Sequence, residues 1–160
     1  MELLRGTHTF ADHFTVPSGK ILKTESGTQL NFNSGKYLYV YGTLNAYNST
    51  YTASSSSWGG IKYYSGSTGT IQYTDITNAY VGIYANNSSP SVSYTDISSC
   101  TYGVRPYYSS ISLSHSAINN CNYGIYAQSG YPNINNSTIS NCTYGAYLRY
   151  SNAGIKEKIT

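Results

Sequence analysis

The sequence is poor in charged residues and has no long apolar run. Lys, Arg, Asp and Glu make up only 9% of its 160 residues, against about 25% in a typical protein. The nine basic residues form no cluster, so the formal net charge of +3 gives little electrostatic basis for binding nucleic acid. No stretch of about 18 apolar residues is present, so we expect no insertion into a membrane.

The familiar signatures of catalytic sites are also missing. The sequence contains no Gly-x-Ser-x-Gly motif, no paired Cys and His, no phosphate-binding loop of the Walker type and no dinucleotide fingerprint. We therefore expect no cofactor and no metal site. The first ten residues, MELLRGTHTF, lack the apolar core and the cleavage site of a signal peptide.

Uncharged polar residues take the place of charged ones. Tyr alone occupies 20 positions, and Ser, Thr and Asn supply most of the remaining hydroxyl and amide groups. A surface of this kind is typical of proteins that work outside cells. We therefore expect a secreted or cell-surface location, with any export signal outside this sequence.

Cysteine is scarce too, but its spacing is informative. Cys100, Cys121 and Cys142 lie 21 residues apart, and each stands two residues before a Tyr and three before a Gly. Self-similarity at a fixed period of this size indicates a solenoid, in which each repeat forms one coil. A leucine-rich repeat has a similar period but requires a Leu-x-x-Leu-x-Leu pattern that is absent here. The same interval separates Gly82, Gly103, Gly124 and Gly145.

Four columns of apolar or small residues, one of which contains the cysteines, repeat with this period. Stacked along a solenoid, they would form its core. The cysteines are then small, reduced, inward-facing core residues rather than reactive groups, and we expect the Gly after each of them at a turn. The columns are Ile71, Val92, Leu113 and Ile134; Ile76, Ile97, Ile118 and Ile139; Ile83, Val104, Ile125 and Ala146; and Ala79, Cys100, Cys121 and Cys142.

Each repeat also shows a strand pattern. Short alternations centred on Ile or Val are broken by Asp, Asn, Gly and Pro, and no helical periodicity is present. Stacked repeats would pair each strand with its equivalent one coil away, at a rise of about 4.8 Å. We therefore predict an all-β fold, a single-stranded parallel β-helix of about seven coils with a 21-residue repeat.

The two ends of the chain fit the repeat less well. We expect one domain over residues 1–160, in which residues 1–13 form a frayed lead-in and the register before Trp58 is undefined. The last residues, AGIKEKIT, begin another repeat, which suggests a piece of a longer solenoid. An open solenoid end exposes strand edges, so end-to-end or side-by-side self-association is expected.

Several ordered segments carry a family resemblance. They are VPSGK near the start, the run LYVYGTLNA, the segment SWGGIKY and later repeats of the form I…DI…N…GIY. Together they resemble the right-handed parallel β-helix repeat family, within the pectate-lyase-like superfamily. The resemblance implies a right-handed coil with three short parallel sheets, often in secreted or surface proteins that bind or process polysaccharide. It does not imply catalysis, because the family includes many stalks and binding modules.

Candidate catalytic residues are few. Only Asp75 and Asp96, of six acidic residues, share a column, which continues as Ala117 and Thr138. One strand spacing apart, the two carboxyls could couple their titrations, share a cation or act as the pair of a retaining glycosidase. Each Asp also fits a turn or a solvated corner. A remnant of a polysaccharide lyase or glycoside hydrolase is therefore the alternative to a non-catalytic module.

The histidines offer no complete site. His115 shares a column with Tyr73, Tyr94 and Asn136, and lacks the second ligand or acid that a zinc site or a general base requires. Near the N-terminus, His8, His13 and Asp12 could bind a metal only adventitiously.

The residues that follow each Cys-x-Tyr-Gly segment are the best candidates for ligand binding. If Ile83 and its equivalents point inward, their neighbours point outward and form a grid of Tyr, Arg and amide side chains on one sheet. Tyr rings stack on sugars, and Arg and amides bind hydroxyls, so the sequence predicts binding of a polysaccharide or a surface-protein partner. Aromatic residues also suit β-sheets without any ligand. The candidates are Tyr84, Arg105, Tyr107, Tyr126, Gln128, Tyr147 and Arg149.

A second array suggests a third function, ice binding. Two columns of small hydroxyl and amide residues would form a flat outward surface of the kind found on regular ice-binding solenoids. No Thr-x-Thr repeat is kept. The columns are Gln72, Ser93, Ser114 and Asn135, and Thr74, Thr95, Ser116 and Ser137.

Overall fold

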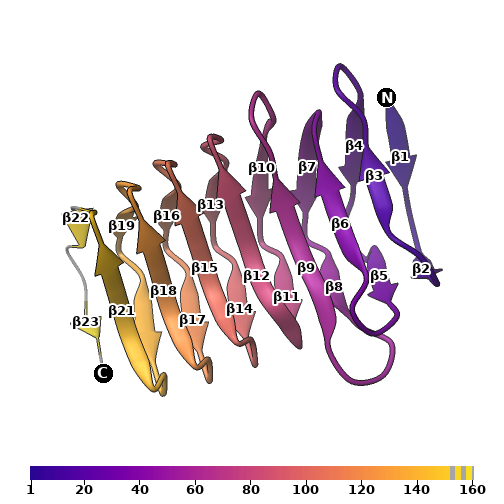
Figure 1. Ribbon diagram of the computed structural model, residues 1–160. Helices are drawn as coiled ribbons and strands as arrows, with labels where there is room; N and C mark the ends of the chain where they lie inside the picture. The colour runs from indigo at the N-terminus through magenta and orange to yellow at the C-terminus, as the bar shows by residue number, and fades with distance from the viewer. Residues whose placement is uncertain (152–153, 156–157, 160) are drawn as a thin grey trace.

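Three parallel sheets wind along one axis. The structure, a computed structural model, describes residues 1–151, 154–155 and 158–159. Each coil contributes one strand to each sheet, and successive coils stack into a rod (Figure 1). Seven complete triplets of strands are followed by β22 (Gly154–Ile155) and β23 (Lys158–Ile159). The predicted all-β parallel solenoid of about seven coils is confirmed. No helix in the described residues is long and apolar enough to cross a membrane.

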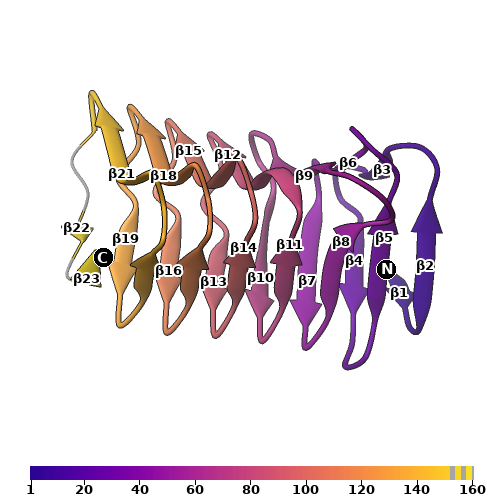
Figure 2. The same cartoon turned by 90° about the horizontal axis from the view of Figure 1, so that it is seen from below.

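The strands of each sheet follow one another at intervals of three in the chain (Figure 2). Sheet 1 consists of β1 (Glu2–Leu4), β4 (Ile21–Thr24), β7 (Thr43–Tyr47), β10 (Thr68–Gln72), β13 (Ser91–Ser93), β16 (Ser112–Ser114), β19 (Asn133–Asn135) and β22. Sheet 2 consists of β2 (Thr7–Phe10), β5 (Gln29–Phe32), β8 (Thr50–Ala53), β11 (Asp75–Thr77), β14 (Asp96–Ser98), β17 (Ala117–Asn119), β20 (Thr138–Ser140) and β23. Sheet 3 consists of β3 (Phe14–Val16), β6 (Tyr37–Val40), β9 (Trp58–Tyr63), β12 (Ala79–Asn86), β15 (Tyr102–Tyr107), β18 (Tyr123–Gln128) and β21 (Tyr144–Arg149).

The 21-residue period is the pairing register of the later coils. In sheet 1, Val92 pairs with Leu113 and Leu113 with Ile134. The predicted apolar columns are buried and line the interior, with partial burial only at the last rungs, Cys142 and Ala146. The strands before Trp58 also pair in a regular register, which the sequence left undefined. In most of these pairs the two residues are more than 21 positions apart, so the early coils are longer than the later ones.

Each later coil turns its three corners with residues in the left-handed backbone region. Their φ angles lie between 46° and 56°, a conformation that is uncommon for bulky side chains. Backbone hydrogen bonds along the rod hold these corners: the Tyr94 N–H donates to the Ser114 carbonyl, and the His115 N–H to the Asn135 carbonyl, both at 3.1 Å. The corner residues are Tyr73, Tyr94, His115 and Asn136; Asn78, Ser99, Asn120 and Asn141; and Asn87, Tyr108, Ser129 and Tyr150.

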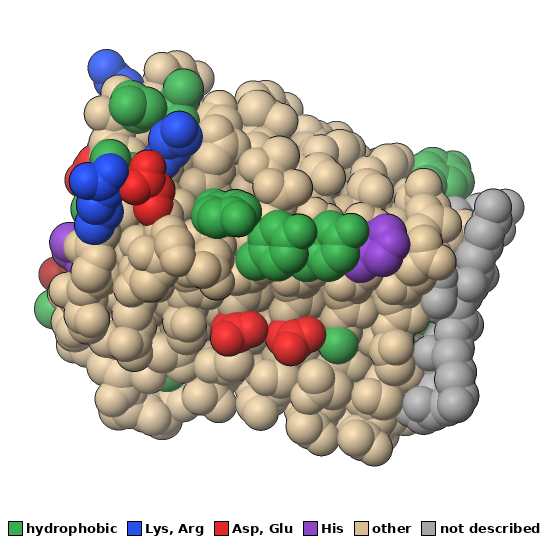
Figure 3. Space-filling model, turned by 180° about the vertical axis from the view of Figure 1, so that it is seen from behind, with side chains coloured by type: hydrophobic (Ala, Val, Ile, Leu, Met, Phe, Trp, Pro, Cys, Tyr) green, Lys and Arg blue, Asp and Glu red, His purple; other side chains and the backbone are tan. Residues whose placement is uncertain are grey.

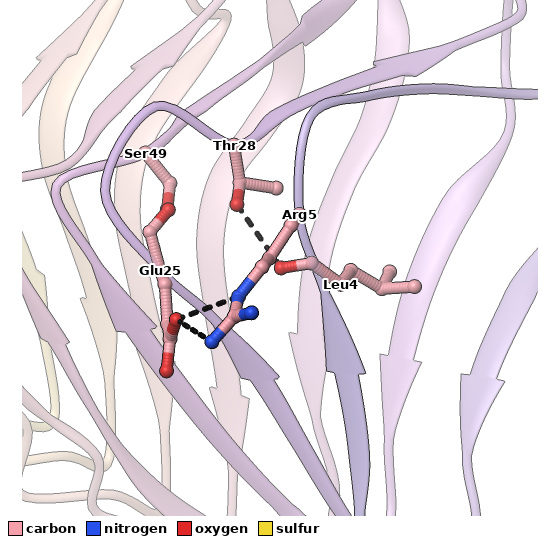
Figure 4. A network of polar contacts seen from close by, with 5 residues as sticks. All are labelled: Leu4, Arg5, Glu25, Thr28 and Ser49. Atoms are coloured by element: carbon pink, nitrogen blue, oxygen red, sulfur yellow. Dashed lines mark hydrogen bonds and ion pairs between the residues drawn. The ribbon is translucent and has the colours of Figure 1, made fainter.

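The first coil is ordered by pairing rather than frayed. Strands β1 and β2 pair in register with β4 and β5. Beside them, the Arg5 guanidinium pairs with the Glu25 carboxylate, at 2.8 Å between Nη2 and Oε2, and the Thr28 hydroxyl donates to the Leu4 carbonyl at 3.1 Å (Figure 4). From the following coil, the Ser49 hydroxyl donates to the Glu25 carbonyl. The expectation that this segment is frayed was therefore wrong.

Aromatic stacking fills the interior of the early coils. Phe10, Phe32 and Trp58 form a column with ring centroids 4.9 and 4.6 Å apart. The Trp58 indole N–H donates to the Thr77 carbonyl at 2.8 Å, so the ring is packed without leaving its polar atom unpaired. Trp58 pairs in register with Ala79, so the aromatic column is followed in the later coils by the column of Ala79 and the cysteines.

The repeated glycines lie inside strands of sheet 3, not at turns. Gly82, Gly103 and Gly124 have no left-handed backbone, and each is needed for a close approach between coils. A Cβ on Gly103 would lie 2.6 Å from the Gly124 carbonyl oxygen and 2.6 Å from a methyl carbon of Ile118. The expected turn was wrong because the corner comes earlier, at Ser99 and its equivalents.

Replacing Gly103 by Ala should lower the free energy of unfolding by about 1–3 kcal/mol, because the added methyl overpacks a backbone contact. Gly154→Ala is the matched control. A Cβ there meets its nearest neighbour at an ordinary 3.6 Å, so little change is expected. Urea denaturation followed by circular dichroism measures both variants. Equal stability of Gly103→Ala and Gly154→Ala would contradict the close-approach explanation.

Candidate functional site

The outward side of sheet 3 carries Tyr, cationic and amide side chains along most of the rod. Inward and outward residues alternate on its strands, so the residues flanking the buried Ile and Val face solvent. No Asp or Glu lies in any strand of this sheet. We call this surface the tyrosine face. It comprises Tyr37, Tyr39, Lys62, Tyr84, Asn86, Tyr102, Arg105, Tyr107, Tyr123, Tyr126, Gln128, Tyr144, Tyr147 and Arg149.

The structure brings all seven predicted ligand-binding residues onto this face. The register pairs Tyr84 with Arg105, Tyr107 with Gln128, Tyr126 with Tyr147 and Gln128 with Arg149. Their role in binding stays a prediction. The list of candidates predicted from the sequence left out two groups of residues on this face. Tyr37, Tyr39 and Lys62 precede the regular repeat. Tyr102, Tyr123 and Tyr144 each stand directly before a repeated Gly, and this position could have identified them.

Rings on the tyrosine face stack on one another along the rod. Tyr102, Tyr123 and Tyr144 form one column with centroids 5.1 and 4.8 Å apart and planes 13° apart. Tyr126 and Tyr147 form a second, 5.0 Å apart and at 15°. Neighbouring rings therefore cover much of each other's faces. What they offer to a ligand is mainly ring edges and phenol hydroxyls, rather than the open faces expected for stacking on sugars.

A separate aromatic ladder follows the corner between sheets 1 and 2. Tyr73, Tyr94 and His115 stack at centroid distances of 4.8 and 4.9 Å, with planes 6° and 14° apart. Tyr47 meets the ladder edge-on, 5.6 Å from Tyr73. Figure 3 shows this row of hydrophobic side chains ending in a histidine, above a pair of acidic residues. His115 thus belongs to a stacked column, as its sequence position indicated.

The two acidic residues below the ladder are paired in register. Asp75 lies opposite Asp96 on strands β11 and β14, and both are exposed. Partial burial raises the pKa of Asp75 above its ordinary value, and the negative charge of Asp96 raises it further. Because the folded state raises this pKa, the carboxyl contributes less stability as the pH rises through the folded and unfolded values.

The surroundings of Asp75 do not resemble an acid–base site. A shallow hollow of about 320 Å³ beside it is lined by hydroxyl, amide and backbone groups, including those of Asn48, Ser49 and Tyr73. Asp96 does not line this hollow, and neither does any His, Lys or Arg. Within the described residues, no three His, Cys, Asp or Glu side chains are placed to hold a metal ion.

The N-terminal histidines have separate partners. The His8 Nε2 lies 2.8 Å from the Arg5 carbonyl, and the His13 Nδ1 accepts a hydrogen bond of 3.0 Å from the Tyr37 backbone N–H. Asp12 forms an ion pair with Lys36, at 3.1 Å. The structure therefore does not unite these three residues in one cluster.

The outward array proposed for ice binding is not formed. The column of Thr74, Thr95, Ser116 and Ser137 is buried. Each of its hydroxyls donates to the carbonyl two residues earlier. Those of Thr95, Ser116 and Ser137 also accept from a backbone N–H of the preceding coil; Ser116 Oγ, for example, accepts from the Thr95 N–H at 3.1 Å. The prediction failed because these hydroxyls satisfy buried backbone groups at an inside corner.

The cysteines form the inward column that the period predicted. All three are free thiols; Cys100 and Cys121 are buried, and Cys142 is partly buried. Each thiol lies 3.2 to 3.3 Å from the carbonyl two residues earlier, to which it donates. Contact with Cys121 and burial both raise the pKa of Cys100. Burial and these hydrogen bonds place the column in the core.

Comparison with known proteins supports the fold. The family model described as "Right handed beta helix region" matches residues 17–156. No curated protein matches the chain. No solved structure matches it either.

Replacing Asp96 by Asn should lower the pKa of Asp75, because it removes the like charge paired with it. Titration of the carboxyl carbon by nuclear magnetic resonance measures this pKa. Asp12→Asn removes a carboxylate that pairs with Lys36 instead, and should leave Asp75 unchanged. An Asp75 pKa that does not move in Asp96→Asn would show that the two carboxyls are not coupled.

Proposed function

The chain belongs to the right-handed β-helix family, and from this premise we propose that it is a rigid, non-catalytic module of a secreted or cell-surface protein whose tyrosine face binds polysaccharide. The observation that carries the proposal is the run of Tyr, cationic and amide side chains from β6 to β21 of sheet 3, with no carboxylate in any strand of the sheet.

Polysaccharide fits the chemistry of this surface. A glycan chain presents hydroxyls at regular intervals, and each strand of the tyrosine face from β6 to β21 presents at least one phenol, cationic or amide group. Phenol hydroxyls both donate and accept hydrogen bonds, and Gln128 and Arg149 add further donors. Repeated polar contacts of modest strength would sum along an extended ligand.

The scaffold holds these groups in place before any ligand arrives. Each Tyr of the two ring columns packs against a ring one coil away, and rings of different columns meet edge to face, as Tyr123 and Tyr126 do at 5.4 Å. Ordering side chains on binding costs about 0.5–1.5 kcal/mol for each flexible group. Rings fixed by stacking avoid much of that cost.

The lyase or hydrolase alternative has less support from the geometry. Asp75 and Asp96 lie on sheet 2, away from the tyrosine face, and the hollow beside Asp75 contains no second acid or base apart from Tyr73. A surface-protein partner would use the same exposed residues as a glycan. It is therefore a possible outcome of the binding experiment rather than a separate site.

The test is a glycan array probed with the whole chain, followed by affinity measurement on the polysaccharide that binds best. Replacing both Tyr126 and Tyr147 by Ala should weaken binding about tenfold, because hydrogen bonds from two hydroxyls and a buttressed pair of rings are lost. Circular dichroism and thermal melting check that the variant keeps its fold.

A second double variant provides the matched control. Tyr73 and Tyr94 are also a stacked, exposed pair, with centroids 4.8 Å apart, but they lie on the corner ladder. Replacing both by Ala should leave glycan affinity unchanged. An array without any bound glycan, or equal losses in the two double variants, would contradict the proposed role of the tyrosine face.

A further inference from the structure

Two cations flank one aromatic ring on the tyrosine face. The register places Lys62, Tyr84 and Arg105 on three successive strands, β9, β12 and β15. The Lys62 Nζ and the Arg105 Cζ each lie 5.9 Å from the centroid of the Tyr84 ring. All three side chains are half-buried, so the two positive charges share a partly desolvated stretch of the surface.

Among the described residues, no carboxylate forms an ion pair with Lys62 or Arg105. The two ion pairs of the described residues, Arg5 with Glu25 and Lys36 with Asp12, involve neither Lys62 nor Arg105. The strands of sheet 3 contain no acidic residue that could approach them. Like charges on the two sides of one ring, without a counter-ion, raise the energy of the free protein, and an anion bound close to both would relieve it.

Aromatic rings hold the two cations in position. The Lys62 Nζ lies 4.0 Å from the Tyr37 ring centroid, and the Arg105 Cζ lies 5.0 Å from that of Tyr102 and 5.3 Å from that of Tyr126. Cation–π contacts fix the charge without using its N–H donors on an oxygen acceptor. The donors of both groups are therefore available to an oxyanion.

The protonation of Lys62 reflects the same repulsion. Partial burial lowers its pKa, and the positive charge of Arg105 lowers it further. A bound anion would act in the opposite direction and favour the charged ammonium.

We propose that Lys62 and Arg105, on either side of Tyr84, form an anion site that takes the carboxylate or sulfate group of an acidic polysaccharide. This inference rests on the proposed function and names its ligand class. Arg guanidinium binds such oxyanions through paired N–H donors, Lys62 adds a second positive charge, and the flanking Tyr hydroxyls contact the neighbouring sugar.

The experiment compares three polymers that share one backbone: neutral dextran, carboxymethyl dextran and dextran sulfate. Binding to the whole chain is measured by calorimetry at low and at physiological salt. We expect one or both charged polymers to bind more tightly than dextran and to lose affinity as salt rises. Preference for carboxymethyl dextran identifies a carboxylate ligand, and preference for dextran sulfate identifies a sulfate ester.

Variants locate the site. Lys62→Gln with Arg105→Gln should weaken binding of the charged polymer about tenfold or more, because two charge-assisted contacts are lost. Lys20→Gln with Lys23→Gln removes the same charge from exposed residues outside the tyrosine face, and should change the affinity less than about twofold. Equal losses in the two double variants would show a general charge effect and overturn the site.

Three further results would separate the anion site from the proposed polysaccharide binding. Equal binding of neutral and charged polymers would overturn the anion site, while loss of neutral-glycan binding in Tyr126→Ala with Tyr147→Ala would still support the proposed function. Binding of polyglutamate or single-stranded DNA as tight as that of the charged dextrans would overturn the assignment to polysaccharide. Failure of every polymer and of the glycan array would overturn both proposals.

Discussion

Every strand of the inner coils finds its hydrogen-bond partners in the coils before and after it, because the three strands of one coil lie in three different sheets. A coil alone could not satisfy its backbone, and a coil out of step could not pair. Corner residues obey the same constraint, since their N–H groups also donate along the rod. The pairing fixes how far each coil advances, and with it the distance between equivalent side chains.

Equivalent side chains of successive coils have the same spacing, so residues of the same type stack on one another. Inside, this produces columns of Ile, Val and Leu, the thiol column and the row of Thr and Ser hydroxyls that serve backbone groups one coil away. Outside, it produces stacked rings. The strand spacing of about 4.8 Å suits parallel aromatic rings. It also brings like charges together, as at Asp75 and Asp96.

The period allowed much of this to be predicted. Unbroken 21-residue spacing from Ile71 onward gave the core columns and placed Tyr84 and its equivalents outward, where the register puts them. The errors concern features that periodicity does not report. Spacing cannot tell a turn glycine from one required by a close approach, as at Gly103. Nor can it tell that Thr74 and its equivalents turn inward, because a left-handed residue just before each of them shifts the alternation of the strand. Lys62 was overlooked because it precedes the regular repeats.

The column of glycines limits the substitutions that such a chain can accept during evolution. At Gly82, Gly103 and Gly124, the space that a side chain would need is filled by the backbone of the following coil. No single coil can acquire a side chain there unless its neighbour moves, and that neighbour is held by the next. Duplication of a whole coil keeps this close contact, whereas a point substitution at one glycine destabilises the rod. Lengthening by whole repeats is therefore an easier route for this rod than piecemeal divergence at its glycines.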